Sequence, residues 1–128
     1  MNLNKSVVLD SSVWIELLTS GTRLKACQSA FDQAKLIIVP TTVIFEVYRK
    51  IASLLSEDEA LSAMTILMKQ EVKDLTKEIA LTAADLSIEH KLAMADSYVL
   101  AHARLTHSTL ITLDNDFSHL EDVKIIRQ

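Results

Sequence analysis

Several residue types are scarce in this 128-residue chain, and each scarcity narrows the choice of fold and chemistry. One glycine and one proline leave little material for hairpin turns, which disfavours an all-β architecture. The single cysteine, Cys27, has no second cysteine to pair with and no histidine at zinc-ligand spacing, so we expect a structural thiol in a reducing compartment. Aromatic residues are only 5% of the chain, which leaves few platforms for stacked bases. The composition favours an α/β or all-α fold.

The chain also lacks an excess of basic residues and any long apolar run. Its formal net charge of −4 argues against a non-specific nucleic-acid coat, because phosphate binding normally rests on clustered lysine and arginine. No apolar run approaches the roughly 18 residues of a membrane span, and Val7–Leu9 is too short for the core of a signal peptide. We therefore expect a soluble cytoplasmic protein with no membrane partner, formed by a single domain over residues 1–128.

The chain does contain a regular alternation of short apolar runs and longer amphipathic stretches. The apolar runs are typical of buried parallel strands and cover Val7–Asp10, Leu36–Val39, Val72–Leu75, Leu110–Leu113 and Val123–Ile126. The stretches between them carry apolar residues three and four apart, which predicts helices over Ser12–Thr19, Arg23–Ala34, Thr42–Leu55, Glu57–Gln70, Lys77–His90 and Asp96–Thr106. Gly21 is expected to end the first helix with a positive φ, and Ser56 with Glu59 predicts a capping box on the fourth.

Four carboxylates stand at the edges of apolar runs: Asp10, Glu46, Asp96 and Asp114. Side chains at the carboxyl ends of parallel strands converge on the crevice where ligands bind. Two bare carboxylates about 4 Å apart repel by roughly 4 kcal/mol at an effective dielectric of 20, so a cluster stays ionised only around a cation. Hard oxygen ligands indicate Mg²⁺ or Mn²⁺, which bind phosphates. The sequence therefore predicts a metal-dependent phosphodiesterase.

Each acid also has a structural interpretation. Asp10 and Asp96 precede helices and are suited to capping them, although Val99 after Asp96 puts that side chain on a buried helix face. Glu46 can form a surface pair with Lys50, four residues on. These interpretations remain open at the level of residue patterns.

The fourth strand is followed by two acids, of which the site needs one. Asp114 directly follows the strand and is the predicted ligand, whereas Asp116 is expected to cap a short helix over residues 117–120. Ser12 and Thr112 can hydrogen-bond the ligating carboxylates and orient them.

Other chemistry finds little support in the sequence. The four histidines share no zinc-like spacing with Cys27 and are expected at the surface or at helix ends; they are His90, His102, His107 and His119. No serine sits in a nucleophile elbow. Methionine and leucine crowd the helix expected over Glu57–Gln70 beyond one packing face, which fits an adaptable contact surface. Core packing is the default interpretation of these residues.

Four segments in this order and spacing resemble the PIN-domain nucleases: Val8–Val13, Val43–Val47, Ala95–Ala103 and Leu110–Phe117. The resemblance covers the chain end to end and is greatest to the VapC-type toxin ribonucleases of toxin–antitoxin pairs. It implies a three-layer α/β fold with a five-stranded parallel sheet flanked by helices. It also implies a Mg²⁺- or Mn²⁺-dependent endoribonuclease that hydrolyses RNA phosphodiester bonds, forms a homodimer and is inhibited by a small antitoxin protein.

The resemblance also implies roles for individual residues. It implies that Asp10, Glu46, Asp96 and Asp114 form the catalytic acidic cluster, with the hydroxyls of Ser12 and Thr112 nearby. We predict that Asp10, Asp96 and Asp114 bind the metal and that Asp116 has a supporting role. Ser11 stands where the family usually has threonine, which removes no ligand. Two alternatives stay open: an RNA-processing nuclease without an antitoxin, and a catalytically weak binding scaffold. The RNA, its cleavage sequence, the number of metal ions, the antitoxin and the oligomeric state stay open too. So does the choice between Asp114 and Asp116 as the fourth ligand.

Overall fold

The structure is a computed structural model that describes residues 6–127, so the ends of the predicted 1–128 domain, residues 1–5 and 128, lie outside it. Its centre is a parallel sheet in the order β3-β2-β1-β4-β5. The strands are β1 (Ser6–Leu9), β2 (Leu36–Pro40), β3 (Glu71–Lys73), β4 (Thr109–Thr112) and β5 (Val123–Ile125). The predicted sheet of five parallel strands is confirmed.

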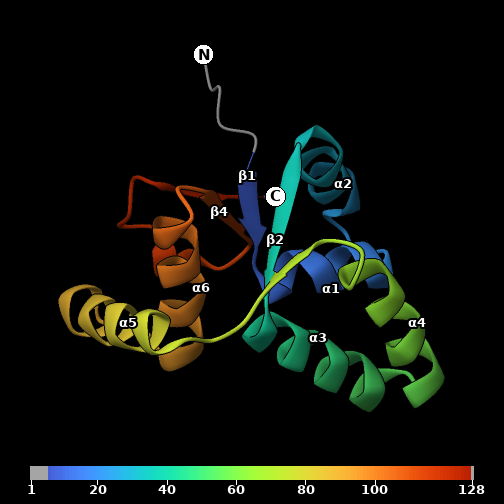
Figure 1. The fold of residues 1–128 in the computed structure, drawn as a ribbon. Helices are drawn as coiled ribbons and strands as arrows, with labels where there is room; N and C mark the ends of the chain where they lie inside the picture. Colours follow the sequence, from blue (N-terminus) through green and yellow to red (C-terminus); the bar gives the residue numbers. More distant parts are fainter. Residues whose placement is uncertain (1–5, 128) are drawn as a thin grey trace.

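Six α-helices and one 3₁₀ segment occupy the connections within residues 6–127. They are α1 (Ser11–Thr19), α2 (Leu24–Gln33), α3 (Thr41–Leu54), α4 (Glu57–Leu67), α5 (Lys77–His90), α6 (Met94–Leu105) and η1 (Asn115–Phe117). Figure 1 shows α5 and α6 on one side of the sheet and α1, α2 and α4 on the other. Over this part of the chain, none of the helices is long and apolar enough to cross a bilayer.

The chain winds outward from β1 in both directions, which puts a switch in strand order between β1 and β4. From β1 the chain passes to β2 and β3, and it then returns through α5 and α6 to β4 and β5. In open α/β sheets such a switch opens a crevice at the carboxyl ends of the strands. The topology therefore defines where a site can form before any side chain is considered.

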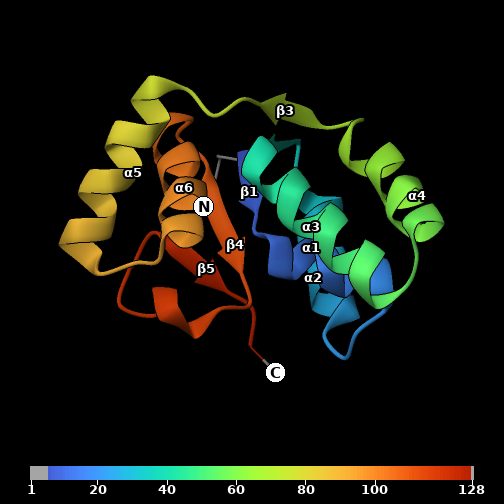
Figure 2. The ribbon, with the colours of Figure 1, turned by 90° about the horizontal axis from the view of Figure 1, so that it is seen from below.

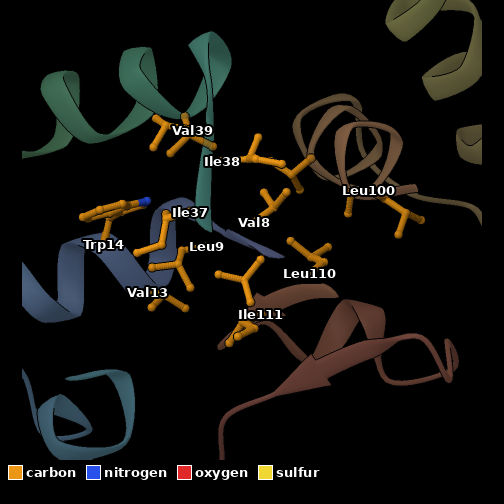
Figure 3. Close-up of a cluster of buried hydrophobic side chains, with 14 of the residues drawn as sticks. Val8, Leu9, Val13, Trp14, Ile37, Ile38, Val39, Leu100, Leu110 and Ile111 are labelled. Atoms are coloured by element: carbon orange, nitrogen blue, oxygen red, sulfur yellow. The ribbon is translucent and has the colours of Figure 1, made fainter. Parts of the chain in front are cut away.

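The core explains why the strands are so apolar. Val8, Leu9 and Leu110 on the two central strands are fully buried, because helices cover both faces of the sheet. Figure 3 shows the packing of these residues, with Trp14 of α1 on one side of the strands and Leu100 of α6 on the other. Trp14 meets Phe31 of α2 edge to face, at a ring-centroid distance of 5.8 Å.

Three local predictions can be compared with the structure. The residue with positive φ after α1 is Ser20 (φ 54°), not Gly21. Gly21 matters for another reason, because a Cβ on it would collide with the carboxylate of Glu16. His102 lies in the last turn of α6, one of the two places expected for the histidines, but it is 1% exposed and therefore not at the surface. Burial lowers the pKa of its imidazole. The Ser56 cap is confirmed, since its Oγ accepts a hydrogen bond from Glu59 N.

Candidate metal centre and active site

The acidic residues gather where β1 and β4 end. Asp10 directly follows β1, and Asp114 follows β4 after a single residue. Figure 2, which views the sheet from below, shows α3 and α6 on either side of these strand ends. Glu46 lies on α3 and Asp96 lies in the first turn of α6, so both helices contribute acids to the crevice.

Asp10 is the most buried carboxylate of the group, at 6% exposure. Its Oδ1 accepts a hydrogen bond from Ser11 N at 2.8 Å, which caps α1 as the structural interpretation expected. Its Oδ2 accepts from Thr112 Oγ1 at 2.7 Å and from Ser12 Oγ at 3.3 Å. Burial raises the pKa of Asp10, while these hydrogen bonds act in the opposite direction. Asp10 therefore caps a helix and faces the crevice at the same time.

The hydroxyls of Ser12 and Thr112 form hydrogen bonds with the backbone of the loop after β4. Ser12 Oγ accepts a hydrogen bond from Leu113 N at 3.1 Å, and Thr112 Oγ1 accepts from Asp114 N at 3.0 Å. The start of α1 is thereby linked to the end of β4. The two hydroxyls orient Asp10 directly and hold the backbone of Asp114.

The short helix after β4 and its cap begin two residues earlier than predicted. Asp114 Oδ1 accepts a hydrogen bond from Asp116 N at 2.8 Å and caps η1, which spans Asn115–Phe117. The expectation that Asp116 caps a helix over residues 117–120 is therefore wrong, because Phe117 is pulled into the core and closes the turn around it. The structure brings one carboxylate oxygen each of Asp96, Asp114 and Asp116 within 4.8 Å of one another, and this group does not include Asp10 or Glu46.

The pKa of Asp96 depends on all the other carboxylates of the site. The N-cap of α6 is Ala93, so the interpretation of Asp96 as a helix cap is wrong. Burial is the first cause that raises its pKa, to about 7, and repulsion from four other carboxylates follows. Those carboxylates, in decreasing order of effect, belong to Asp10, Asp114, Asp116 and Glu46. One side chain therefore senses every acid that the sequence singled out.

Glu46 faces the start of α1 from the neighbouring helix α3. Burial and the charge of Asp10 raise its pKa, and a hydrogen bond with the side chain of Ser11 partly offsets them. The structure describes both Glu46 and Lys50 and records no ion pair between them, so the surface-pair interpretation is wrong. Ser11 was missed as a site residue, although its place directly after Asp10 was a signal.

The negative charge of the crevice has no direct cationic partner in the described part of the chain. The ion pairs between residues 6 and 127 are Lys73–Glu71, His90–Glu89 and Arg104–Asp122. None of them includes a crevice carboxylate. Several carboxylates that repel one another, with oxygen donors close enough to share one ion, fit a hard divalent cation.

The raised pKa of Asp96 predicts how the metal-free protein responds to pH. The folded chain holds this proton up to pH about 7, whereas the unfolded chain releases it near 3.8. Unfolding free energy therefore falls as pH rises through this window, because the unfolded state loses the proton first. Asp96→Asn has no carboxyl group at this position, so we expect its unfolding free energy to fall less than that of wild type between pH 4 and 7. In EDTA the variant therefore becomes more stable relative to wild type as the pH rises through this range.

Chemical denaturation at several pH values in EDTA measures this difference. Asp85→Asn, which removes an exposed carboxylate from α5, is the matched control. A stability difference between wild type and Asp96→Asn that stays constant from pH 4 to 7 would contradict the described electrostatics.

The family model for the PIN domain matches residues 7–123. No curated protein sequence matches the chain. The fold is similar to that of a chain from a toxin–antitoxin complex of Klebsiella pneumoniae, with 24% identity and a TM-score of 0.78 over 91% of this chain and 94% of that one. It is also similar to VapC20 of Mycobacterium tuberculosis, a toxin that cleaves the sarcin–ricin loop, with 17% identity and a TM-score of 0.79 over 93% and 98% of the two chains. Because the family model spans most of the sequence, this chain belongs to the PIN domain family.

Proposed function

We propose that this chain is a metal-dependent endoribonuclease that hydrolyses RNA phosphodiester bonds and serves as the toxin of a type II toxin–antitoxin pair in the cytoplasm. The observation that carries the nuclease proposal is the group formed by Asp96, Asp114 and Asp116, whose carboxylate oxygens lie within 4.8 Å of one another, with the charges of Asp10 and Glu46 also acting on Asp96. Membership of the PIN family and the fold shared with a toxin that cleaves the sarcin–ricin loop support RNA as the substrate.

Asp10, Asp96 and Asp114 are the residues that would hold Mg²⁺ or Mn²⁺. Their donors are all carboxylate oxygens, the ligands that both ions prefer. When bound, such an ion polarises the phosphate and lowers the pKa of a coordinated water. Asp10 keeps lone pairs for this role despite its hydrogen bonds, because each carboxylate oxygen accepts more than one partner.

The remaining residues position groups and move a proton. Glu46 is the proposed general base, since its raised pKa brings a carboxylate closer to the range in which it accepts a proton from the attacking water. Ser12 and Thr112 keep Asp10 in one orientation. Asp116 supports the cluster from η1 by adding negative charge beside Asp96.

The first test is RNA cleavage by purified protein freed of any partner. We expect cleavage of single-stranded or looped RNA only with Mg²⁺ or Mn²⁺, and a loss of more than about 100-fold in Asp10→Asn and Asp96→Asn, the upper end of what supporting ligands cost. Asp85→Asn is the matched control and should cleave like wild type. Undiminished cleavage in EDTA, or equal cleavage by all variants, would overturn the proposal.

Asp114, rather than Asp116, completes the proposed metal set. The backbone of Asp114 is held at the strand end by Thr112, whereas Asp116 is exposed on η1. A single divalent ion cannot offset the repulsion of every further carboxylate in the crevice. Asp114→Asn also tests charge alone, because asparagine retains a side-chain oxygen able to cap η1.

Manganese titration of the two variants distinguishes these acids. We expect Asp114→Asn to bind Mn²⁺ at least about 10-fold more weakly than wild type, in the range reported for disturbed metal sites. Asp116→Asn should keep most of the affinity. Weak binding by Asp116→Asn with normal binding by Asp114→Asn would reverse the assignment.

A small antitoxin is the proposed protein partner, and the surface between α1, α3 and α4 supports it. Two adjoining hollows there, of about 330 and 200 Å³, share Leu18 and Ile66. Apolar side chains that line them are exposed, among them Leu55 (56%) and Ile66 (39%). We propose that the partner lays an apolar segment in this groove and directs a basic side chain to the acidic crevice.

Co-expression with the neighbouring reading frame tests the partner. We expect a stable complex and relief of growth arrest, both lost in Ile66→Glu because a charge in the groove stays unpaired. Leu81→Glu, at a 70% exposed position on α5, is the control. The copy number of this chain in the complex also tests the implied homodimer. Absence of both a complex and growth arrest would favour an RNA-processing nuclease without an antitoxin.

A further inference from the structure

A basic hollow lies apart from the acidic crevice, on the surface where α2 begins. It has a volume of about 360 Å³ and is lined by Thr22, Arg23, Lys25, Ala26 and Arg127. Three of these five residues are cationic, in a chain whose formal net charge is −4. We define this cluster as the basic hollow.

The backbone of α2 adds hydrogen-bond donors to the basic hollow. Arg23 occupies the N-cap position, and no side chain caps the helix. Within residues 6–127, the N–H groups of Lys25 and Ala26 have no backbone acceptor, although their neighbours Leu24 and Cys27 do. Arg23 Nε is buried and likewise has no partner in the described chain. Free N–H groups and the positive end of a helix dipole favour an anion such as phosphate.

A hydrogen bond connects the basic hollow to the acidic loop. Arg127 Nη1 donates to Asn115 Oδ1 at 3.0 Å, and Asn115 lies between the two acids of that loop. Ile126 N donates to Thr112 O at 2.8 Å, which holds the segment after β5 against the end of β4. Figure 2 shows this last segment running below the sheet between η1 and the connection from α1 to α2. Arg127, which lines the basic hollow, is therefore tied to the loop that carries Asp114 and Asp116 beyond the carboxyl end of β4.

One carboxylate, that of Glu16, lies beside the basic hollow. Glu16 Oε2 accepts a hydrogen bond from Arg23 N at 2.6 Å and packs over Gly21, so it is committed to the backbone of the α1–α2 connection. Its charge offsets one of the three cations. The hollow retains an excess of positive charge and the two free N–H groups.

We propose that the basic hollow binds a backbone phosphate of the RNA substrate at a distance from the scissile bond. This inference rests on the proposed ribonuclease function. An acidic crevice repels a polyanion, so a strand that crosses it needs a local cationic anchor. The anchor fixes which phosphate reaches the carboxylates, and it makes the hollow a positioning site rather than a catalytic one.

The test measures binding of a single-stranded oligoribonucleotide in EDTA at several NaCl concentrations, so cleavage is not required. We expect Lys25→Gln and Arg127→Gln to weaken binding and to make the slope of log affinity against log salt shallower by about 0.7 each, the value for one lost phosphate contact on a single strand. Lys35→Gln removes the same charge at an exposed position just before β2, at the opposite edge of the sheet, and should leave the slope unchanged.

Amide chemical shifts supply a second readout. Both the oligoribonucleotide and inorganic phosphate should shift the N–H signals of Lys25 and Ala26, the oligoribonucleotide at a lower concentration. Shifts with phosphate but not with RNA would assign the hollow to a free anion and overturn the proposal. Equal salt slopes for Lys25→Gln and Lys35→Gln would also overturn the proposal. The same holds if Lys25→Gln binds RNA normally but no longer binds the partner protein. If the protein binds RNA through the basic hollow but cleaves no RNA with Mg²⁺, the nuclease proposal is rejected and the phosphate site stands.

Discussion

The main physical constraint on this site is repulsion among its carboxylates. The backbone holds them together at one edge of the parallel sheet, and the surrounding interactions offset that repulsion. Asp10 is held in position, because its backbone N–H donates to Ile111 O and its carboxylate accepts a hydrogen bond from Thr112. A pair of such charges about 4 Å apart costs roughly 4 kcal/mol at a dielectric of 20, against a total stability of about 5–15 kcal/mol for a typical domain. The hydrogen bonds from Ser11, Ser12 and Thr112 offset part of this cost.

The same constraint explains the division of charge along the sheet edge. Acids are concentrated where β1 and β4 end, whereas the basic side chains near them line a separate hollow at the start of α2. Cations placed inside the crevice would form ion pairs with the carboxylates and compete with a metal. Separation leaves the acids available to an ion and the bases available to a phosphate. Arg127 joins the two regions through Asn115 without entering the acidic cluster.

The bounds of β1, β2, β4 and β5 were predictable to within one residue because buried strands are continuous apolar runs. The exception is the edge strand β3, which covers Glu71–Lys73 instead of the expected Val72–Leu75 and so ends two residues early. It pairs with β2 alone and is exposed at two of its three residues, so hydrophobicity gives no sharp boundary there. The starts of α3 and α6 differ from the prediction by one and two residues, since Pro40 and Ala93 occupy their N-cap positions without offering a capping side chain.

The sequence by itself determined the order of strands and helices and the identity of the acids, because apolar periodicity and residue type are local properties. Tertiary structure decided which acids meet. The turn that presents both Asp114 and Asp116 to Asp96 depends on Phe117 reaching the core, and the burial of His102 depends on the packing of α6 in the core. Arg127 and Arg23 are more than a hundred residues apart, and only the closure of the sheet lets them line one hollow. Such long-range contacts leave no periodic signal in a single chain, so sequence patterns alone do not reveal them.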